Sequence, residues 1–109
     1  MKLVIAFVHI DDVGIILTKL QRANISVTAL ESRGGFLRRE NSTILTAVEE
    51  GEVERVLALL RETCRPRVEH VDTTFASGSL ESIGLPATAE IPVGGATVFI
   101  LDVARVVKI

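Results

Sequence analysis

The segment from Arg33 to Arg39 reads Arg-Gly-Gly-Phe-Leu-Arg-Arg, and it combines cations, backbone freedom and an aromatic ring. Arginine side chains bind phosphate oxygens through charge-assisted and often bidentate hydrogen bonds. The adjacent glycines Gly34 and Gly35 allow the main chain to approach a ligand without a Cβ atom in the way. The ring of Phe36 offers a flat surface on which a base can stack. The segment therefore indicates phosphate or nucleotide binding, with a tight turn carrying solvated arginines as the simpler alternative.

Other patterns that support catalysis or metal binding are not found in the sequence. Neither Gly34-Gly35 nor Gly94-Gly95 is followed by the Lys-Ser or Lys-Thr pair of a phosphate-binding loop. His9 and His70 lack a cysteine or acidic partner at ligand spacing, so we interpret His9 as structural and expect no metal site. The pair Asp11-Asp12 is interpreted as a helix cap. We therefore predict a protein that is not an enzyme and holds no cofactor.

Length, composition and charge limit the classes of protein to which the chain can belong. A chain of 109 residues with 48% apolar and 24% charged residues is typical of one globular domain, here residues 1–109. The net charge of −2 gives no overall field for a polyanion, so we expect no nucleic-acid partner. No apolar run approaches the roughly 20 residues that span a bilayer. The single cysteine, Cys64, cannot form an internal disulfide and is interpreted as a small core residue. We expect a cytoplasmic protein without a membrane partner.

Apolar periodicity divides the chain into helices and strands. Two segments carry apolar residues at i, i+3, i+4 and i+7, starting at Val13 and at Val53, and both are predicted to be helices. Asp11 or Asp12 is expected to cap the first helix, and Asn24 to end it in a left-handed conformation. Strands are predicted at 2–10, 25–33, 42–49 and 96–103, with a further strand-like stretch from residue 89 to the second glycine pair and a long loop at 65–88.

The order strand, helix, strand, strand, helix, strand predicts a ferredoxin-like βαββαβ sandwich. This is an α+β fold with both helices on one face of an antiparallel sheet. The first strand is apolar on both faces, with Leu3, Ile5 and Phe7 on one and Val4, Ala6 and Val8 on the other. Two helices cover only one side of a sheet, and the other side would expose an apolar patch that soluble monomers avoid. We therefore predict a homo-oligomer whose subunits pack sheet against sheet.

Five short segments of the chain, taken together, are typical of one protein family. They are Met1-Lys2-Leu3-Val4, Val27-Thr28, Gly34-Gly35-Phe36-Leu37, Asn41-Ser42-Thr43 and Val93-Gly94-Gly95-Ala96-Thr97-Val98-Phe99. In combination they resemble the PII-like cyclic-di-AMP receptor family. The resemblance extends over nearly the whole chain, and residues 65–88 are the least similar part.

The resemblance implies a homotrimer of ferredoxin-like subunits that binds one cyclic dinucleotide in each cleft between neighbours. It implies signal transduction without catalysis, in which the ligand repositions the long loops and so changes docking to a downstream protein. Carried over residue by residue, it places in the ligand site Thr28, Gly35, Phe36, Leu37, Asn41, Gly94, Gly95 and Phe99. Arg33 and Arg38 are candidates for phosphate contacts beside them.

Two positions depart from the pattern of the family. Ser26 stands where an arginine is usual, and Ala47 stands where a glycine is usual. Loss of a cation beside a phosphate costs about 1.5–3 kcal/mol, so a sensor of ATP, ADP or AMP is an alternative. A trimeric metal-handling protein of the same fold is a further alternative. It would require several converging Cys, His or Met ligands, and the chain has one Cys, two His and one Met.

Overall fold

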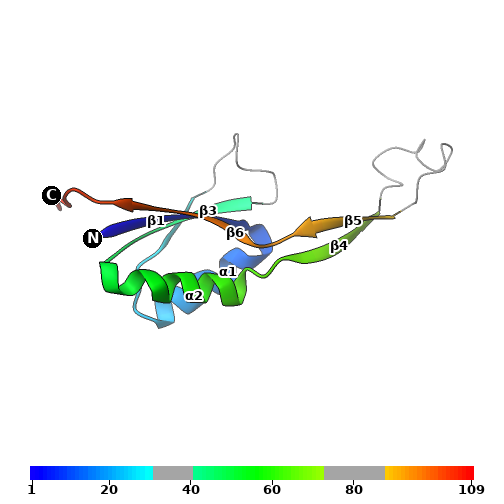
Figure 1. Cartoon of the computed structure of the whole chain (residues 1–109), viewed down its shortest axis with the longest axis horizontal. Coiled ribbons are helices and arrows are strands. Elements are labelled where there is room, and N and C mark those ends of the chain that lie inside the picture. The colour runs from blue at the N-terminus through cyan, green and yellow to red at the C-terminus, as the bar shows by residue number, and fades with distance from the viewer. Residues whose placement is uncertain (31–40, 73–87) are drawn as a thin grey trace.

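Two helices lie on one face of a four-stranded antiparallel sheet, and a two-stranded arm extends from one end of this body (Figure 1). The computed structural model describes residues 1–30, 41–72 and 88–109. Along the chain the elements are β1 (Lys2–His9), α1 (Ile10–Arg22), β2 (Thr28–Leu30), β3 (Asn41–Val48), the short 3-10 helix η1 (Glu50–Glu52), α2 (Val53–Thr63), β4 (Arg67–Asp72), β5 (Thr88–Val93) and β6 (Ala96–Asp102). None of the helices in this described part is long and apolar enough to cross a membrane.

The strand order of the larger sheet is β2-β3-β1-β6, and each neighbouring pair is antiparallel. The helix α1 carries the chain from β1 to β2, which leaves room for β3 between these two strands. This order, with both helices on one face, confirms the predicted α+β class and is compatible with a ferredoxin-like fold. The strands β4 and β5 are inserted between α2 and the last strand of the sheet.

The core lies between the two helices and the face of the sheet that they cover. Alternate residues of β1 face the helices and are almost fully buried, namely Val4, Ala6 and Val8. The predicted apolar stripes of the helices meet them, and they bury Ile16, Leu20, Val56 and Leu60. Cys64 continues the second stripe and is 3% exposed, which confirms it as a small core residue. Burial, together with the charge of Asp12, raises the pKa of its thiol to about 11.

The start of α1 differs from the sequence prediction. The N-cap is His9, and not Asp11 or Asp12. The extended backbone of His9 (φ −65°, ψ 141°) places its imidazole Nδ1 so that it accepts the backbone N–H of Asp11 at 3.1 Å. Both aspartates then lie in the first turn, where their charge suits the positive end of the helix dipole. The predicted helix end is confirmed, because Asn24 has a φ of 60°.

The strand β4 shows that Arg67–Asp72, part of the loop predicted at 65–88, is not a loop, whereas residues 73–87 lie outside the described residues. The strand β5 confirms the strand-like stretch predicted from residue 89, and it forms the arm together with β4. The two strands pair antiparallel from Arg67 opposite Val93 to Asp72 opposite Thr88, and they form a sheet separate from the larger one. Figure 1 shows this arm projecting beyond both helices. Two strands that satisfy each other's backbone groups without being buried under a helix need no apolar periodicity. For this reason a polar segment with scattered apolar residues was mistaken for a loop.

The base of the arm fixes the glycine turn between β5 and β6. Gly94 and Gly95 have positive φ values of 86° and 73°. A Cβ atom at position 94 would collide with the carbonyl oxygen of Arg65 and would lie 2.8 Å from a guanidinium nitrogen of Arg67. Position 94 therefore requires glycine for its backbone conformation and also for the close approach of the chain that enters β4.

One side of the larger sheet, here called the outer face, faces away from the helices (Figure 1). The strand register shows that this face is rich in apolar residues. The register places on this face Leu3, Ile5 and Phe7 of β1, Thr43, Leu45 and Ala47 of β3, and Thr97, Phe99 and Leu101 of β6. Phe99 and Leu101 are each 45% exposed. The second apolar side that the sequence predicted is present, and neither helix covers it.

We expect Gly94→Ala to lower the free energy of unfolding by at least about 1 kcal/mol, because a side chain at positive φ is strained and this Cβ also collides with Arg65. Urea denaturation followed by circular dichroism measures the change. Gly14→Ala is the matched control, since a Cβ at position 14 of α1 has open space around it. That control should be stabilised by about 0.5–1 kcal/mol, as alanine is the better helix former. Equal effects of the two substitutions would contradict this account.

Cys64 should react very slowly with a thiol-specific reagent at pH 8. Both its burial and its raised pKa of about 11 leave almost no thiolate at that pH. The rate of colour release with an aromatic disulfide reagent, compared between folded protein and protein in guanidinium chloride, measures the protection. A rate in the folded protein close to the denatured rate would show that the thiol is accessible.

Candidate functional site

A hollow of about 320 Å³ lies where the end of β1, the start of β3 and the turn between β5 and β6 meet. It is lined by Phe7, Asn41, Gly94, Gly95, Ala96 and Thr97. The strand register produces this meeting, because Phe7 is opposite Thr97 and the next residues on β1 are opposite Ala96 and Asn41. Three residues that the resemblance assigned to a ligand site, Asn41, Gly94 and Gly95, are thus brought together from distant parts of the chain.

Thr28 and Phe99, the other described candidates, do not line this hollow but lie on the outer face. One row of directly opposite residues crosses the sheet from β2 to β6 and consists of Thr28, Leu45, Ile5 and Phe99. Neighbouring strands are about 4.8 Å apart, so the ends of this row are about 14 Å apart. In one copy of the chain, Thr28 and Phe99 therefore lie at opposite edges of the outer face.

The rings of Phe7 and Phe99 connect the outer face to the hollow. They pack edge to face, with their centroids 6.0 Å apart and their planes at 86°. Phe7 lines the hollow, whereas Phe99 lies opposite Ile5, two residues before Phe7 on β1. An apolar or stacking surface therefore continues from the hollow on to the outer face.

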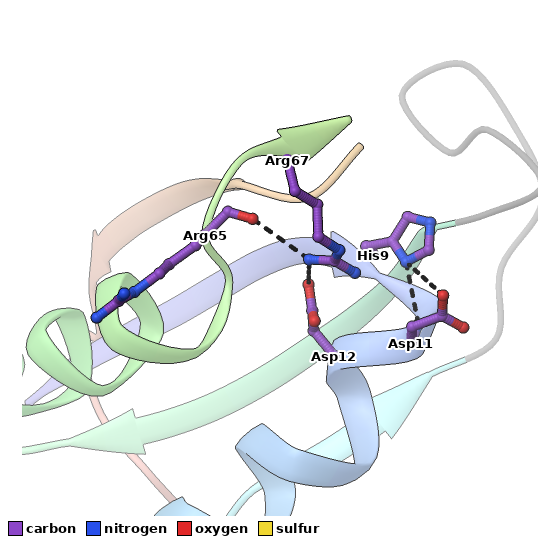
Figure 2. A network of polar contacts seen from close by, with 5 residues as sticks. All are labelled: His9, Asp11, Asp12, Arg65 and Arg67. Atoms are coloured by element: carbon purple, nitrogen blue, oxygen red, sulfur yellow. Dashed lines mark hydrogen bonds and ion pairs between the residues drawn. The ribbon is translucent and has the colours of Figure 1, made fainter. Parts of the chain in front are cut away.

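A polar network at the base of the arm joins the start of β4 to the first turn of α1 (Figure 2). A guanidinium nitrogen of Arg67 forms a 3.2 Å ion pair with Asp12 and donates a 3.3 Å hydrogen bond to the carbonyl of Arg65. Asp12 is 5% exposed, so this pair ties the first turn of α1 to the arm in a partly dry setting. The hydrogen bond to Asp12 raises the pKa of Arg67, and Gly94 packs directly against Arg65 and Arg67. Helix, arm and turn are therefore mechanically joined beside the hollow.

Sequence reasoning missed three of the residues that line the hollow, Phe7, Ala96 and Thr97. Thr97 could have been found, since it offers a hydroxyl two residues after the glycine pair. Phe7 was interpreted only as part of an apolar face. The candidates Arg33, Gly35, Phe36, Leu37 and Arg38 lie outside the described residues, so their assignment stays a prediction. Asn41 is the first residue after that segment, and it lines the hollow.

The two positions that depart from the family pattern, Ser26 and Ala47, lie together near the other end of the sheet. They line a second hollow of about 420 Å³ beside the end of α1. Ala47 is opposite Leu3 on the outer face, two rows away from Phe7. Among the described residues, the departures are therefore separate from the hollow that contains Asn41 and the glycine turn.

Comparison with known proteins places the chain in a family. A crystal structure of a functionally unknown protein from Pediococcus pentosaceus ATCC 25745 is similar to it, with a TM-score of 0.73 and 29% sequence identity. The match covers 99% of this chain and 96% of that chain. The model of the cyclic-di-AMP receptor family matches residues 1–109, and this match supports a role in binding cyclic-di-AMP. The chain, matched over its whole length, belongs to the cyclic-di-AMP receptor family.

Proposed function

We propose that this chain is a PII-like signal-transduction protein that binds cyclic-di-AMP in clefts between the subunits of a homotrimer. In this proposal the chain has no catalytic activity, acts in the cytoplasm and relays the state of its ligand through loop rearrangement to a downstream protein. The observation that carries the proposal is the hollow lined by Asn41 and the Gly94-Gly95 turn, in a chain that matches the cyclic-di-AMP receptor family over residues 1–109.

The groups that line the hollow suit an adenine nucleotide. The amide of Asn41 can both donate to and accept from the edge of an adenine. Exposed main-chain N–H groups in a turn of two positive-φ glycines, such as Gly94-Gly95, can bind a phosphate oxygen. Phe7 and Phe99 offer a surface for a base, and stacking is worth about 1–3 kcal/mol per base. The proposal adds Arg33 and Arg38 as phosphate contacts and Gly35, Phe36 and Leu37 as further pocket residues.

The outer face supports a site that is shared between subunits. It exposes Phe99 and Leu101, and large exposed apolar patches on soluble domains mark interfaces. Thr28 and Phe99 occupy opposite edges of this face in one copy, so an adjacent copy can bring the Thr28 edge of one subunit to the Phe99 edge of its neighbour. The number of three subunits rests on the family resemblance.

An adenine mononucleotide is the second candidate ligand. It is favoured by Ser26, which removes a cation where the family pattern has one, and by Ala47, whose methyl group lies on the outer face. A ligand with a single adenine would need neither the missing cation at position 26 nor the missing glycine at position 47 if it occupied only the hollow beside Asn41. The two candidates differ in the number of adenine rings to be held, so one set of titrations distinguishes them.

Calorimetric titration of the full chain with cyclic-di-AMP should give saturable binding, and Asn41→Ala should weaken it about tenfold. Loss of one amide that pairs with an adenine edge removes about 1–1.5 kcal/mol. Gln21→Ala removes an exposed amide on α1 and serves as the control, with unchanged affinity expected. Binding of ATP, ADP or AMP without binding of cyclic-di-AMP would assign the alternative. The absence of binding by all four nucleotides would contradict the proposed function.

Sedimentation analysis should give a particle three times the mass of the 11.8 kDa chain, and Leu101→Glu should shift it towards the monomer. A carboxylate on the outer face would have to be buried between subunits, which costs several kcal/mol. Ile15→Glu makes the same change at an exposed apolar position of α1 and should leave the oligomer intact. A wild-type particle with the mass of one chain would remove the shared cleft from the proposal.

A further inference from the structure

The last seven residues of the sequence, 103–109, run out beyond β6 and are largely exposed in one copy of the chain. Figure 1 shows them leaving the body at the end opposite the arm. The N–H of Val103 donates a 3.1 Å hydrogen bond to the carbonyl of Met1, which ties the start of this segment to the start of β1. Beyond this point Val106 and Val107 are 54% and 64% exposed, and Ile109 is fully exposed. Exposed apolar side chains that follow one another in this way mark a contact surface.

The segment 103–109 also carries positive charge. It reads Val-Ala-Arg-Val-Val-Lys-Ile, with the cations Arg105 and Lys108 and no acidic side chain. Neither cation forms an ion pair with the described residues. In an extended chain alternate side chains share a side, so Arg105, Val107 and Ile109 would lie together. A surface that covers this side should therefore be both apolar and acidic.

The hollow of about 420 Å³ before the start of β2 is a surface of this kind. Ala23 and Ala47 contribute to its apolar wall, and Glu49 and Glu52 contribute carboxylates. The side chain of Glu49 is 75% exposed. Oε2 of Glu52 is buried and has no hydrogen-bond donor among the described residues, although Arg55, the one cation in the lining, lies 3.5 Å away as an ion pair. The hollow therefore offers acceptors that a further guanidinium could bind.

Within one copy, the segment and this hollow lie at the same end of the sheet but at opposite edges. Lys2, the first residue of β1, is opposite Val48 on one side and Asp102 on the other. The hydroxyl of Thr46 donates a 2.6 Å hydrogen bond to the carbonyl of Ser26, which holds the chain before β2 beside the end of β3. The edge strands β2 and β6 are about 14 Å apart, and β3 and β1 lie between them.

A neighbouring copy brings the segment and the hollow together. The strands β2 and β1 run in the same direction and β6 runs in the opposite one, because each neighbouring pair is antiparallel. If copies related by rotation about an axis along the strands place β6 of one beside β2 of the next, the end of β6 therefore lies beside the start of that β2. Seven extended residues span about 23 Å, which is enough to pass over the hollow.

We propose that residues 103–109 of each subunit pack on the hollow before β2 of the next subunit, with Arg105 facing Glu49 and Glu52 of that subunit. Val107 and Ile109, on the same side as Arg105, would cover the apolar wall. The contact would fasten neighbouring subunits at the end of the sheet opposite the hollow that contains Asn41, because Asn41 is opposite His9, at the other end of β1 from Lys2. This inference rests on the proposed oligomer and adds a contact that needs no nucleotide.

The test is cross-linking of the full chain carrying Ser26→Cys and Val107→Cys with a short bis-maleimide. Denaturing electrophoresis should show linked dimers and trimers, because each segment reaches a different copy, and mass spectrometry should identify the peptides that contain positions 26 and 107. Cys64 is buried and its pKa is raised to about 11, so it should stay unmodified. Gly14→Cys with Val107→Cys is the matched control. Position 14 has open space but lies near the other end of α1, so linked copies should not form.

Charge reversal tests the proposed ion pair. Arg105→Glu should raise the protein concentration at which the oligomer dissociates by about tenfold, since one attraction becomes a repulsion at every interface of the ring. Addition of Glu49→Arg to this variant should restore most of the loss. Arg61→Glu reverses an exposed charge on α2 away from the hollow and should leave the dissociation unchanged. Sedimentation over a dilution series without nucleotide measures all four proteins, including the wild type.

The inference is overturned if the wild type is an oligomer but positions 26 and 107 link within one chain, or link no more than the control pair. It is also overturned if Arg105→Glu dissociates at the same concentration as the wild type. A wild-type particle with the mass of one chain would remove the proposed oligomer together with this contact. Sedimentation of the unlinked protein therefore separates failure of the oligomer from failure of this contact alone.

Discussion

The central sheet is apolar on both sides, and the chain has helices for only one of them. Val4, Ala6 and Val8 are buried beneath α1 and α2, while the outer face presents Phe99 and Leu101 to solvent. Hydrophobic stabilisation scales with the apolar area removed from water, so a second protein surface packed on the outer face would add to the stability that the helices provide on the other face. The proposed shared cleft follows from this imbalance, and the strand order supplies its two sides by placing Thr28 and Phe99 at opposite edges of that face.

The second constraint is the crowding at the base of the arm. Gly94 packs against the carbonyl of Arg65, Arg67 is paired with buried Asp12, and Glu69 approaches His9 and Asp11. These contacts join the start of α1, the start of β4 and the turn before β6. The hollow lined by Asn41 and Thr97 opens beside this junction. A residue pair that the sequence suggests only as ligand contacts, Gly94-Gly95, therefore also has a structural reason to be glycine.

Much of the fold could be predicted because it depends on local patterns. Helical spacing from Val13 and from Val53 identified both helices, and Asn24 identified the end of the first one. The strand β5 was predicted from residue 89, but β4 and its pairing with β5 were not, because β4 is stabilised by that pairing and carries no apolar alternation. The cap was assigned to the wrong residue, since Asp11 and Asp12 are common caps and histidine is not. Half of the residues that line the hollow had been named from the sequence as candidates for ligand binding. Asn41 and the glycine pair came from motifs, whereas Phe7 reached the hollow only through the register of β1 with β6.

The turn at Gly94-Gly95 belongs at once to the hollow and to the arm, and this has a geometric consequence. Six paired residues on each strand, at about 3.3 Å per residue, make the arm about 20 Å long from its base. The wall of the hollow is also the base of the arm. A rotation of about 10° about the Gly94-Gly95 turn would displace the far end of the paired strands by about 3.5 Å, slightly more than the length of a hydrogen bond. A small change of geometry at the hollow would therefore be larger at the far end of the arm.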